Sequence, residues 1–237
     1  HLGQQISSNF SGTINCIHCA RKTNKSFSQG YCYPCFRSLA ACDTCIFKPE
    51  LCHFSQGTCR EPAWGEEHCF APHYVYLANT SNLKIGITRQ VNTPTRWLDQ
   101  GAVAALPILQ VNNRLASGLV ETLIASQVSD KTAWQRMLKN DLVEVNLQAE
   151  ANRLLEEFLP QIDQLADVSY QRLEEQPLEI NYPVLEYPSK IKSLNLDKTP
   201  QINGQLMGIK GQYLILDTGV INLRKYAGYE VEAQLGV

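Results

Sequence analysis

All nine cysteines of this chain lie between residues 16 and 69, and this clustering constrains the fold more than any other feature of the sequence. The first four form a C-x2-C-x12-C-x2-C pattern, in which "CIHC" and "CYPC" flank a polar segment of hairpin composition. Four thiolates at this spacing can close a tetrahedron around Zn²⁺, as in a zinc ribbon. Disulfides in a secreted domain are the alternative, but pairs spaced in this way are poor disulfide partners. We therefore expect a first zinc site formed by Cys16, Cys19, Cys32 and Cys35.

The other five cysteines are spaced less regularly, and two histidines lie beside them. The most compact set of four, which we expect to bind a second Zn²⁺, comprises Cys42, Cys45, Cys52 and Cys59. Alternative ligands are Cys69, His53 and His68. An iron–sulfur cluster and uncoordinated buried thiols are alternative interpretations of this group. Both zinc sites are expected to be structural, because coordination by cysteines alone leaves no open position for a substrate.

The charge balance shows that the whole molecule is no polycation. There are 21 Lys and Arg residues and 23 Asp and Glu residues, which give a formal net charge of −2. Residues 126–180 contain 11 acidic and 5 basic side chains, whereas residues 73–125 contain 2 and 4. Nucleic-acid affinity is therefore expected on a local face of the first half, and the acidic stretch is expected to be solvent-facing helix. No run approaches the roughly 20 apolar residues of a membrane span, and the start lacks a secretory signal, so we expect a soluble, cytoplasmic protein.

The rest of the chain divides into segments of different character. β-branched and aromatic runs at 73–78, 83–89 and 105–111 predict strands, and the segment 116–129 has the periodicity of a helix. We predict an α+β fold with four parts. These are a zinc-binding Cys-rich head over residues 1–72, a small α/β core with a three-stranded antiparallel sheet over residues 73–145, an acidic helical segment over residues 146–180, and a C-terminal β-barrel or β-sandwich module over residues 181–237.

The middle segment resembles the GIY-YIG endonuclease superfamily over roughly residues 73–128. Its order of strand, strand, helix, strand and helix is that of the family. The run "VYL" stands where the first signature tripeptide would be, with Tyr76 matching its tyrosine, and "KIG" stands at the second, with Gly86 matching its glycine. The family's arginine matches Arg96 in "TRWLDQ", and its metal-binding glutamate matches Glu121 in "GLVETLI".

Three positions depart from the family pattern. Lys84 stands where a tyrosine usually opens the second tripeptide, and Val75 replaces the glycine of the first. Gln100 is the residue nearest to a histidine that often follows the arginine. Some members carry lysine in the second tripeptide, so we interpret Lys84 as a variant of the signature.

The resemblance implies a phosphodiesterase that acts on DNA or RNA and depends on Mg²⁺ or Mn²⁺. Tyr76 would be the general base, with its pKa lowered by the positive charge of Lys84. Arg96 would bind the phosphate, and Glu121 would supply a carboxylate oxygen to the metal. Two further arginines near the ends of strands are expected to bind the flanking nucleic-acid backbone: Arg89 and Arg114.

The chain is also similar, over most of its length, to an uncharacterised bacterial domain family of unknown function. That similarity rests on the Cys-rich head together with "CREPAWGEEHC", "KIGITR", "RWLDQGA" and "GIKGQYL". It supplies no activity, so two functions besides the nuclease stay open. One is a nucleic-acid-binding protein that keeps the nuclease fold without turnover. The other is a protein-interaction adaptor built on the zinc ribbon and the C-terminal module.

Overall fold

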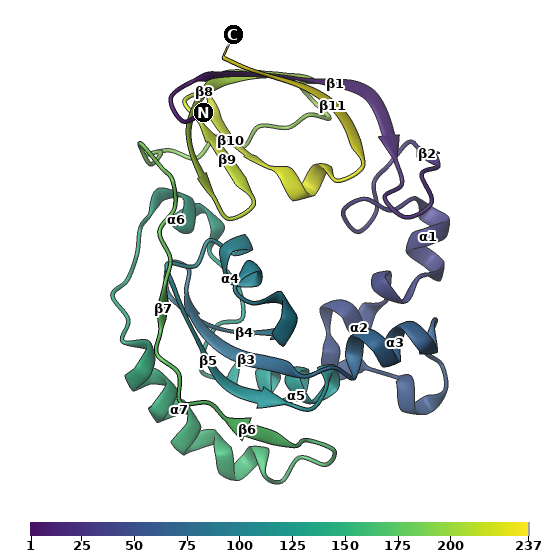
Figure 1. Ribbon diagram of the computed structural model, residues 1–237, viewed down its shortest axis with the longest axis vertical. Coiled ribbons are helices and arrows are strands. Elements are labelled where there is room, and N and C mark those ends of the chain that lie inside the picture. Colours follow the sequence, from purple (N-terminus) through teal and green to yellow (C-terminus); the bar gives the residue numbers. More distant parts are fainter. Residues whose placement is uncertain (237) are drawn as a thin grey trace. The chain divides into compact units, whose positions relative to one another are not determined.

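The computed structural model describes residues 1–236 and divides the chain into two compact units of mixed α and β structure (Figure 1). The first unit consists of His1–Cys42, Leu138–Asn140 and the segment from Tyr182 onward. The second unit consists of Asp43–Met137 and Asp141–Asn181. In the sequence, the second unit is therefore inserted into the first.

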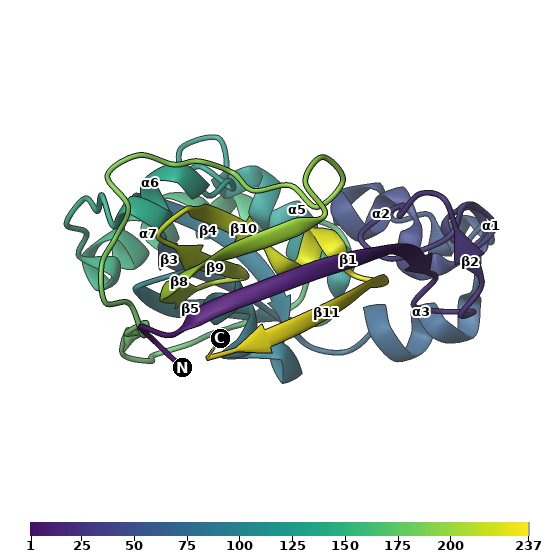
Figure 2. The same cartoon turned by 90° about the horizontal axis from the view of Figure 1, so that it is seen from above.

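The first unit contains a six-stranded sheet that joins segments from both ends of the chain. Its strands are β1 (Gln5–Asn15), β2 (Lys22–Thr23), β8 (Gln201–Lys210), β9 (Tyr213–Leu216), β10 (Gly219–Asn222) and β11 (Tyr229–Leu235). The order is β10-β9-β8-β1-β11, with β2 also paired to β1, and neighbouring strands are antiparallel. Figure 2 shows the long β1 running beside β11.

The alternation of residues along β8 explains how this sheet forms a core. Ile202 and Leu206 are buried, while Gln201 and Asn203 are exposed, as expected when one face of a strand packs inward. The buried side chains of the cluster are Ile6, Leu196, Ile202, Leu206, Leu216, Ile221 and Tyr226. The sequence analysis separated a head from a C-terminal module, whereas the structure gives them one sheet. The physical reason is that β1 has two edges to pair, and β8 and β11 satisfy them.

The second unit is built around a five-stranded antiparallel sheet of order β4-β3-β5-β6, with β7 also paired to β5. Its strands are β3 (His73–Asn79), β4 (Leu83–Arg89), β5 (Ala104–Val111), β6 (Tyr170–Arg172) and β7 (Leu178–Glu179). The three strands predicted in the middle segment therefore form and pair with one another. The two short strands come from the segment predicted to be helical, and they extend the sheet beyond the three expected strands.

The helices are short except for two. The first unit contains α1 (Tyr33–Ser38) and the 3-10 turns η1 (Ala40–Cys42) and η5 (Leu223–Tyr226). The second contains α2 (Thr44–Phe47), η2 (Pro49–Leu51), η3 (Phe54–Gln56), α3 (Pro62–Cys69), η4 (Gln90–Asn92), α4 (Thr95–Asp99), α5 (Arg114–Ile124) and α7 (Leu147–Ile162). The helix α6 covers Trp134–Lys139.

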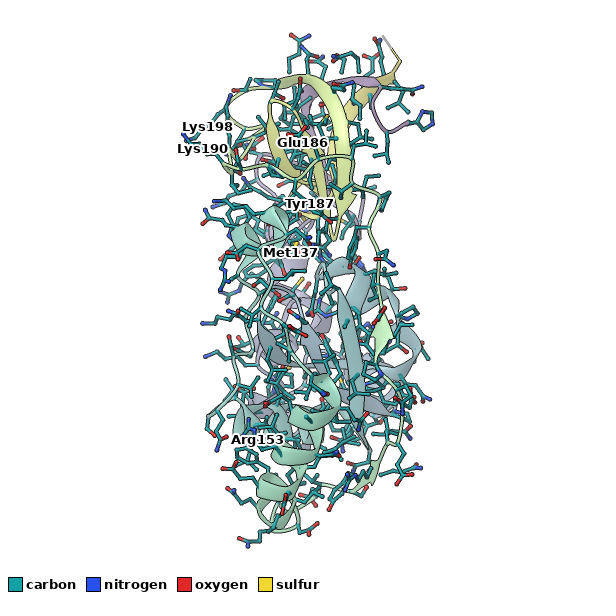
Figure 3. The ribbon with its side chains drawn as sticks, turned by 90° about the vertical axis from the view of Figure 1, so that its left-hand side faces the viewer. Met137, Arg153, Glu186, Tyr187, Lys190 and Lys198 are labelled. Atoms are coloured by element: carbon teal, nitrogen blue, oxygen red, sulfur yellow. The ribbon has the colours of Figure 1, made fainter. Side chains whose placement is uncertain are left out.

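The two long helices, α5 and α7, share the main core of the second unit with the sheet. Each is capped by an asparagine: the Asn113 side chain accepts from the Ala116 backbone N–H, and Asn146 accepts from Ala149. Both helices contribute buried apolar side chains to the cluster that includes Val75, Leu77 and Ile85. Only part of the acidic stretch is helical: Glu150, Glu156 and Glu157 lie on α7, where Arg153 (labelled in Figure 3) pairs with Glu150 and Glu157.

The boundaries of the second unit differ from the predicted domains in one more respect. Residues 43–72, predicted as part of a separate head, belong to the unit that holds the α/β core. The contact is made by η2, which packs against α5. No helix in the described part of the chain has the length and apolar character needed to cross a membrane.

Candidate functional site

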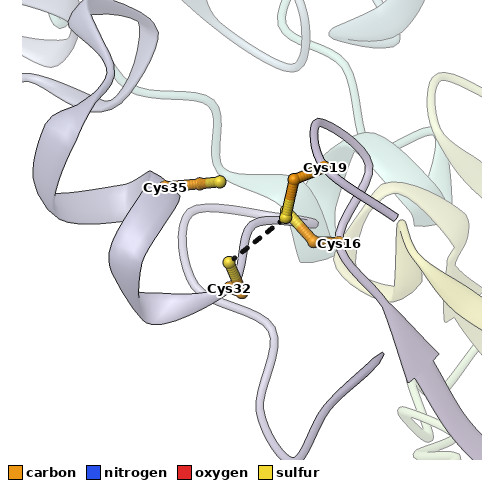
Figure 4. Close-up of side chains that lie close together, drawn as sticks. All are labelled: Cys16, Cys19, Cys32 and Cys35. Atoms are coloured by element: carbon orange, nitrogen blue, oxygen red, sulfur yellow. Dashed lines mark hydrogen bonds between the residues drawn. The ribbon is translucent and has the colours of Figure 1, made fainter. Parts of the chain in front are cut away.

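Four cysteines of the first unit lie close enough together to hold one metal ion. Cys16 and Cys19 follow β1, while Cys32 precedes α1 and Cys35 lies in its first turn. All four sulfurs lie within 4.8 Å of one another, and the sulfurs of Cys19 and Cys32 are 3.7 Å apart (Figure 4). The sequence prediction of the first metal-binding group is therefore confirmed at the level of geometry.

The backbone around Cys16 favours a thiolate. After Cys16 the chain turns back so that the Ala20 N–H donates to the Cys16 carbonyl, with Ala20 in the left-handed region at φ 57°. Burial raises the pKa of the Cys16 thiol, but backbone N–H groups of Cys19, Cys32 and His18 outweigh it and bring the pKa down to about 6. A sulfur surrounded by amide donors is prepared to bind a cation as thiolate.

The second cysteine group is arranged differently from the prediction. The other group of ligands within 4.8 Å of one another in the described residues comprises Asp43, Cys45 and His53. Cys42 belongs to the first unit, and Cys52 and Cys59 are not part of either group. The predicted set of four is therefore not among the groups compact enough for one ion in the described residues, because spacing in the sequence does not decide which sulfurs meet. The alternative ligand His68 instead stacks its ring on Trp64 at 4.3 Å.

Asp43 already has cationic and backbone partners. Its carboxylate caps α2 by accepting from the Thr44 N–H at 2.6 Å, and it pairs with Arg60 at 2.8 Å. The His53 ring lies 3.4 Å from the same carboxylate. A guanidinium bound to the carboxylate opposes the approach of a metal cation, so these three residues are better explained as a structural network.

A second concentration of polar residues lies on the sheet of the second unit. Tyr76 pairs with Gly86 across β3 and β4, and Ala78 pairs with Lys84, so these side chains project from the same face. A Cβ on Gly86 would lie 2.6 Å from the Tyr76 hydroxyl and 2.7 Å from its Cζ. The phenol ring thus lies directly over Gly86, and this contact requires glycine at the end of "KIG".

Tyr76 is connected to Arg96 through Gln100. The Gln100 amide, oriented to satisfy both neighbours, donates its N–H to the Tyr76 hydroxyl at 2.8 Å. Its oxygen accepts from Nε and Nη2 of Arg96, at 3.2 Å each. Trp97 of α4 packs its ring edge against Tyr76 at 5.8 Å. The helix α4 therefore buries the tyrosine with Trp97 and leaves the Arg96 side chain exposed.

Lys84 and Glu121 lie in the same electrostatic environment. The Lys84 ammonium donates to the Asp130 carbonyl at 2.9 Å, and burial lowers its pKa to about 8, with a further contribution from Arg96. Burial raises the pKa of Glu121, on α5, to about 7, although Lys84 and Arg96 act in the opposite direction. Tyr76 interacts with Arg96 and Glu121 as well. Of the four residues that the family resemblance singled out, Tyr76 on β3 and Lys84 on β4 thus each interact electrostatically with Arg96 on α4 and Glu121 on α5.

The ionisation of Tyr76 differs from what the sequence analysis expected. Burial raises the pKa of its phenol to about 12, even though Arg96 and Gln100 favour the ionised form. Lys84 is not among the groups that set this pKa, so the lysine does not tune the tyrosine in the way predicted. The pKa is raised because the Tyr76 side chain is fully buried, with Trp97 packed against it, so desolvation outweighs the nearby positive charge of Arg96.

The two predicted backbone-binding arginines are placed differently from each other. Arg114 donates to the Ile46 carbonyl at 2.5 Å, and Cys45, Cys69 and Arg89 all affect its pKa, which burial lowers. Its guanidinium is thus directed toward the Cys-rich segment of the second unit. Arg89, at the end of β4, is half-buried.

Two residues of the polar group had no catalytic role in the sequence analysis. Gln100 was noted only as the residue nearest to a missing histidine, yet its amide joins Tyr76 to Arg96. Asp130 contributes its backbone carbonyl, which no side-chain pattern reveals. A signal for Gln100 exists in its position four residues after Arg96, the spacing that places two side chains on one helical face.

Comparison with known proteins identifies a family without assigning an activity. A family model described as "Protein of unknown function (DUF2797)" matches residues 3–231, so the chain belongs to this family. No curated protein and no solved structure matches this chain.

Proposed function

We propose that this member of the DUF2797 family is a metal-dependent nucleic-acid phosphodiesterase with a site of the GIY-YIG endonuclease type. The observation that supports the proposal is that Tyr76 and Lys84 each interact electrostatically with Arg96 and Glu121, which come from two further elements. Phosphodiester hydrolysis needs a proton acceptor, a cation for the phosphate and a carboxylate for a metal ion. Arg96 is the candidate cation and Glu121 the candidate metal ligand. Tyr76 and Lys84 are both candidates for the proton acceptor.

Arg96 and Glu121 have the clearest roles. Arg96 is exposed and held by the Gln100 oxygen through Nε and Nη2, which leaves its remaining N–H groups to bind a phosphate. Glu121 is the carboxylate that would hold Mg²⁺ or Mn²⁺, and such an ion supplies Lewis-acid stabilisation of the phosphoryl oxygens. A carboxyl pKa of about 7 means that Glu121 becomes a better ligand as the pH rises through neutrality.

Two side chains compete for the role of proton acceptor. Tyr76 has a pKa of about 12 and stays protonated at neutral pH, so its hydroxyl is suited to orienting water or phosphate. Lys84 has a pKa of about 8, which makes a neutral amine available in mildly alkaline solution. This ordering favours Lys84 as the base and Tyr76 as the positioning group, the reverse of the roles assigned by the family resemblance.

Cleavage assays test the proposal directly. Purified protein with Mg²⁺ or Mn²⁺ is incubated with single- and double-stranded DNA and RNA, beside a Glu121→Gln variant. We expect cleavage by the wild type and a loss of about 100-fold or more in the variant. Glu156→Gln, which changes an exposed glutamate of α7, is the matched control and keeps full activity. Equal cleavage by the wild type and Glu121→Gln would exclude this site.

The pH dependence separates the two proton acceptors. If Lys84 is the base, the cleavage rate of the wild type rises through about pH 8, and Tyr76→Phe keeps that rise at a lower rate. Lys84→Met removes the rise. If the wild-type rate does not rise through pH 8 and Tyr76→Phe abolishes all cleavage, the base is Tyr76.

A binding protein without turnover is the second candidate, and the full burial of Tyr76 favours it. Such a protein would use Arg96 to hold phosphate and would lack an accessible base. It predicts binding to DNA or RNA that weakens with salt and with Arg96→Ala, but no cleavage with either metal. If the protein shows no salt-dependent binding to DNA or RNA, the remaining function is that of a protein-interaction adaptor.

The first cysteine group is assigned to zinc as part of the same proposal. Four sulfurs within 4.8 Å of one another suit the tetrahedral geometry of a zinc ribbon, and cysteines that serve as metal ligands suit a reducing compartment such as the cytoplasm. Metal analysis is expected to find zinc that Cys32→Ser loses and Cys42→Ser keeps. Zinc retained by Cys32→Ser at the wild-type level would argue against the assignment.

A further inference from the structure

Four cysteines of the second unit remain outside the first metal-binding group. They are Cys45, Cys52, Cys59 and Cys69, with the spacing C-x6-C-x6-C-x9-C. Cys45 lies on α2, Cys52 directly follows η2, Cys59 precedes α3, and Cys69 is the last residue of α3. The four cysteines thus sit on or next to three short elements, in a segment that has little apolar core of its own. Such a segment is typical of chains that fold around a bound inorganic group.

The four thiols interact electrostatically with one another. Burial raises the pKa of Cys45 to about 11, and Asp43, Cys52 and Cys69 raise it further. Burial also raises the pKa of Cys69, to which Cys52 and Cys59 contribute. The sulfur of Cys59 lies against α3, 3.4 Å from the position of a Cβ on Gly65. Each of the four is therefore in electrostatic range of at least one other, with Cys69 linked to all three.

Their separation does not suit a single ion. Zinc with four thiolates requires all the sulfurs at about 2.3 Å from one centre, so that they nearly touch one another. Among the described residues, the groups compact enough for this include neither Cys52, Cys59 nor Cys69. A four-iron cluster instead takes one thiolate at each of four separate iron corners, so its ligands stand farther apart.

Positive charge is provided beside these thiols. Arg114 interacts electrostatically with both Cys45 and Cys69, and its Nη2 donates to the carbonyl of Ile46, next to Cys45. Its Nε is buried and has no hydrogen-bond partner within residues 1–236. Arg89 also interacts with Cys69. An anionic cluster with four thiolates would be balanced by these arginines, and a sulfur of the cluster would satisfy the unpaired Nε.

We infer that Cys45, Cys52, Cys59 and Cys69 bind an iron–sulfur cluster of the four-iron type. Binding replaces four S–H bonds with four Fe–S bonds and releases four protons, while the iron and sulfide come from the cell's cluster-assembly machinery. The inference replaces the second zinc site expected from the sequence, with Cys69 in place of Cys42. It does not depend on the proposed nuclease activity.

The cluster would also support the polar group on the sheet. The helix α5 carries Glu121 and packs through Gly118 on Pro49 and Glu50 of η2, which lies between Cys45 and Cys52. Ligation on both sides of η2 fixes the surface on which α5 rests. We expect removal of the cluster to loosen α5 before it affects the sheet of the first unit.

The test is the metal content of the full chain purified without oxygen. We expect about four iron and four acid-labile sulfide per chain, brown colour and the electron paramagnetic resonance signal of a reduced cluster after dithionite. Cys59→Ser and Cys69→Ser are expected to lose at least half of the iron and keep the zinc. Cys42→Ser keeps both metals, and Cys32→Ser loses zinc but keeps iron.

Several outcomes would overturn the inference. One is wild-type protein with two zinc ions per chain and no iron, and another is wild-type protein with neither metal beyond the first zinc. Iron retained in full by both Cys59→Ser and Cys69→Ser would also exclude these ligands. If the serine variants fail to fold, the wild-type metal and sulfide content still decides the matter. Nuclease assays on the same samples are independent, since an inactive protein that contains the cluster would refute only the proposed function.

Discussion

At the scale of single residues, the contact between Tyr76 and Gly86 is the most informative. The resemblance to a nuclease family pointed to both positions, and the structure shows the physical reason for the glycine. What the sequence could not show is the ionisation of Tyr76, because its burial depends on Trp97 from another element. The role of Gln100 could not be predicted for the same reason, since its partners are Tyr76 on β3 and Arg96 one helical turn earlier.

Replacing Gly86 with alanine is expected to destabilise the protein by about 1–3 kcal/mol, because the new Cβ would lie 2.6 Å from the Tyr76 hydroxyl. Denaturant unfolding measures the change. Removing the hydroxyl should relieve part of the clash, so Gly86→Ala combined with Tyr76→Phe is expected to be more stable than the sum of the single effects. Strict additivity in this cycle would show that the ring does not lie on the glycine.

His73 predicts a pH dependence of stability. It is fully buried on β3, its Nδ1 contacts the Ala71 carbonyl, and burial with the nearby Arg114 and Arg89 lowers its pKa to about 4. The unfolded chain binds a proton near pH 6.5 and the folded chain only near pH 4, so the stabilising contribution is present above pH 6.5 and is lost as the pH falls toward 4.

The size of this contribution is on the order of 3 kcal/mol. Urea unfolding between pH 4 and pH 7 is expected to show the loss in the wild type and a flatter dependence in His73→Gln. The exposed His1 provides the matched control, since His1→Gln should follow the wild type. A His73→Gln slope equal to that of the wild type would place the pH dependence elsewhere.

At the scale of elements, the packing of α5 on η2 shows where helix propensity and tertiary packing favour different residues. Gly118 lies in the middle of α5, where glycine is normally unfavourable by about 1 kcal/mol relative to alanine. The sequence predicted a helix at 116–129 with this glycine inside it, and the structure places the helix at Arg114–Ile124. The reason for the glycine is a close approach of backbone: a Cβ would lie 2.6 Å from Pro49 Cβ and 2.7 Å from the Glu50 nitrogen.

Gly118→Ala is therefore expected to destabilise the second unit by about 1–3 kcal/mol, although alanine favours the helix. Thr122→Ala, at an exposed position of the same helix, has no such contact and is expected to stabilise by a few tenths of a kcal/mol. Chemical denaturation of both variants provides the comparison. If both variants gained stability, the close packing between α5 and η2 would be disproved.

Strands and the long helices were predictable because their patterns are local. The strands at 73–78, 83–89 and 105–111 lie within two residues of β3, β4 and β5, and alternation of apolar residues is sufficient to find them. The short β6 and β7 were missed because two or three residues carry no period, and their pairing with β5 decides their conformation. The Cys-rich segment has the same difficulty, since spacing alone does not show which sulfurs meet.

At the scale of the whole molecule, the sequence suggested four consecutive parts, whereas the structure shows two units, both of them discontinuous in the sequence. Linear boundaries were drawn where composition changes, after residues 72, 145 and 180. Composition does not indicate which strands pair. The pairing of β1 with β8 and β11, about 200 residues away, could therefore not be predicted from it. Long-range pairing of this kind is the part of a fold that a single sequence hides best.

The position of β1 inside its sheet predicts the effect of a proline. Ser7 pairs with Asn203 on one side and Gln234 on the other. Ser7→Pro removes a backbone donor and is expected to cost about 3 kcal/mol or more, whereas Ser7→Ala, which keeps the donor, changes stability by less than about 1 kcal/mol. Thermal unfolding and limited proteolysis of residues 182–236 report the difference. Similar behaviour of the two variants would mean that β1 is dispensable to the sheet.

The central place of β1 also sets an order of events during translation. The strand leaves the ribosome early, but its partners at Gln201–Lys210 and Tyr229–Leu235 are made only after the entire inserted unit. Its unpaired edges must stay exposed, or be shielded by a chaperone, while the second unit is synthesised and free to fold. Most of β1 is thus paired only after the strands of the second unit have been made.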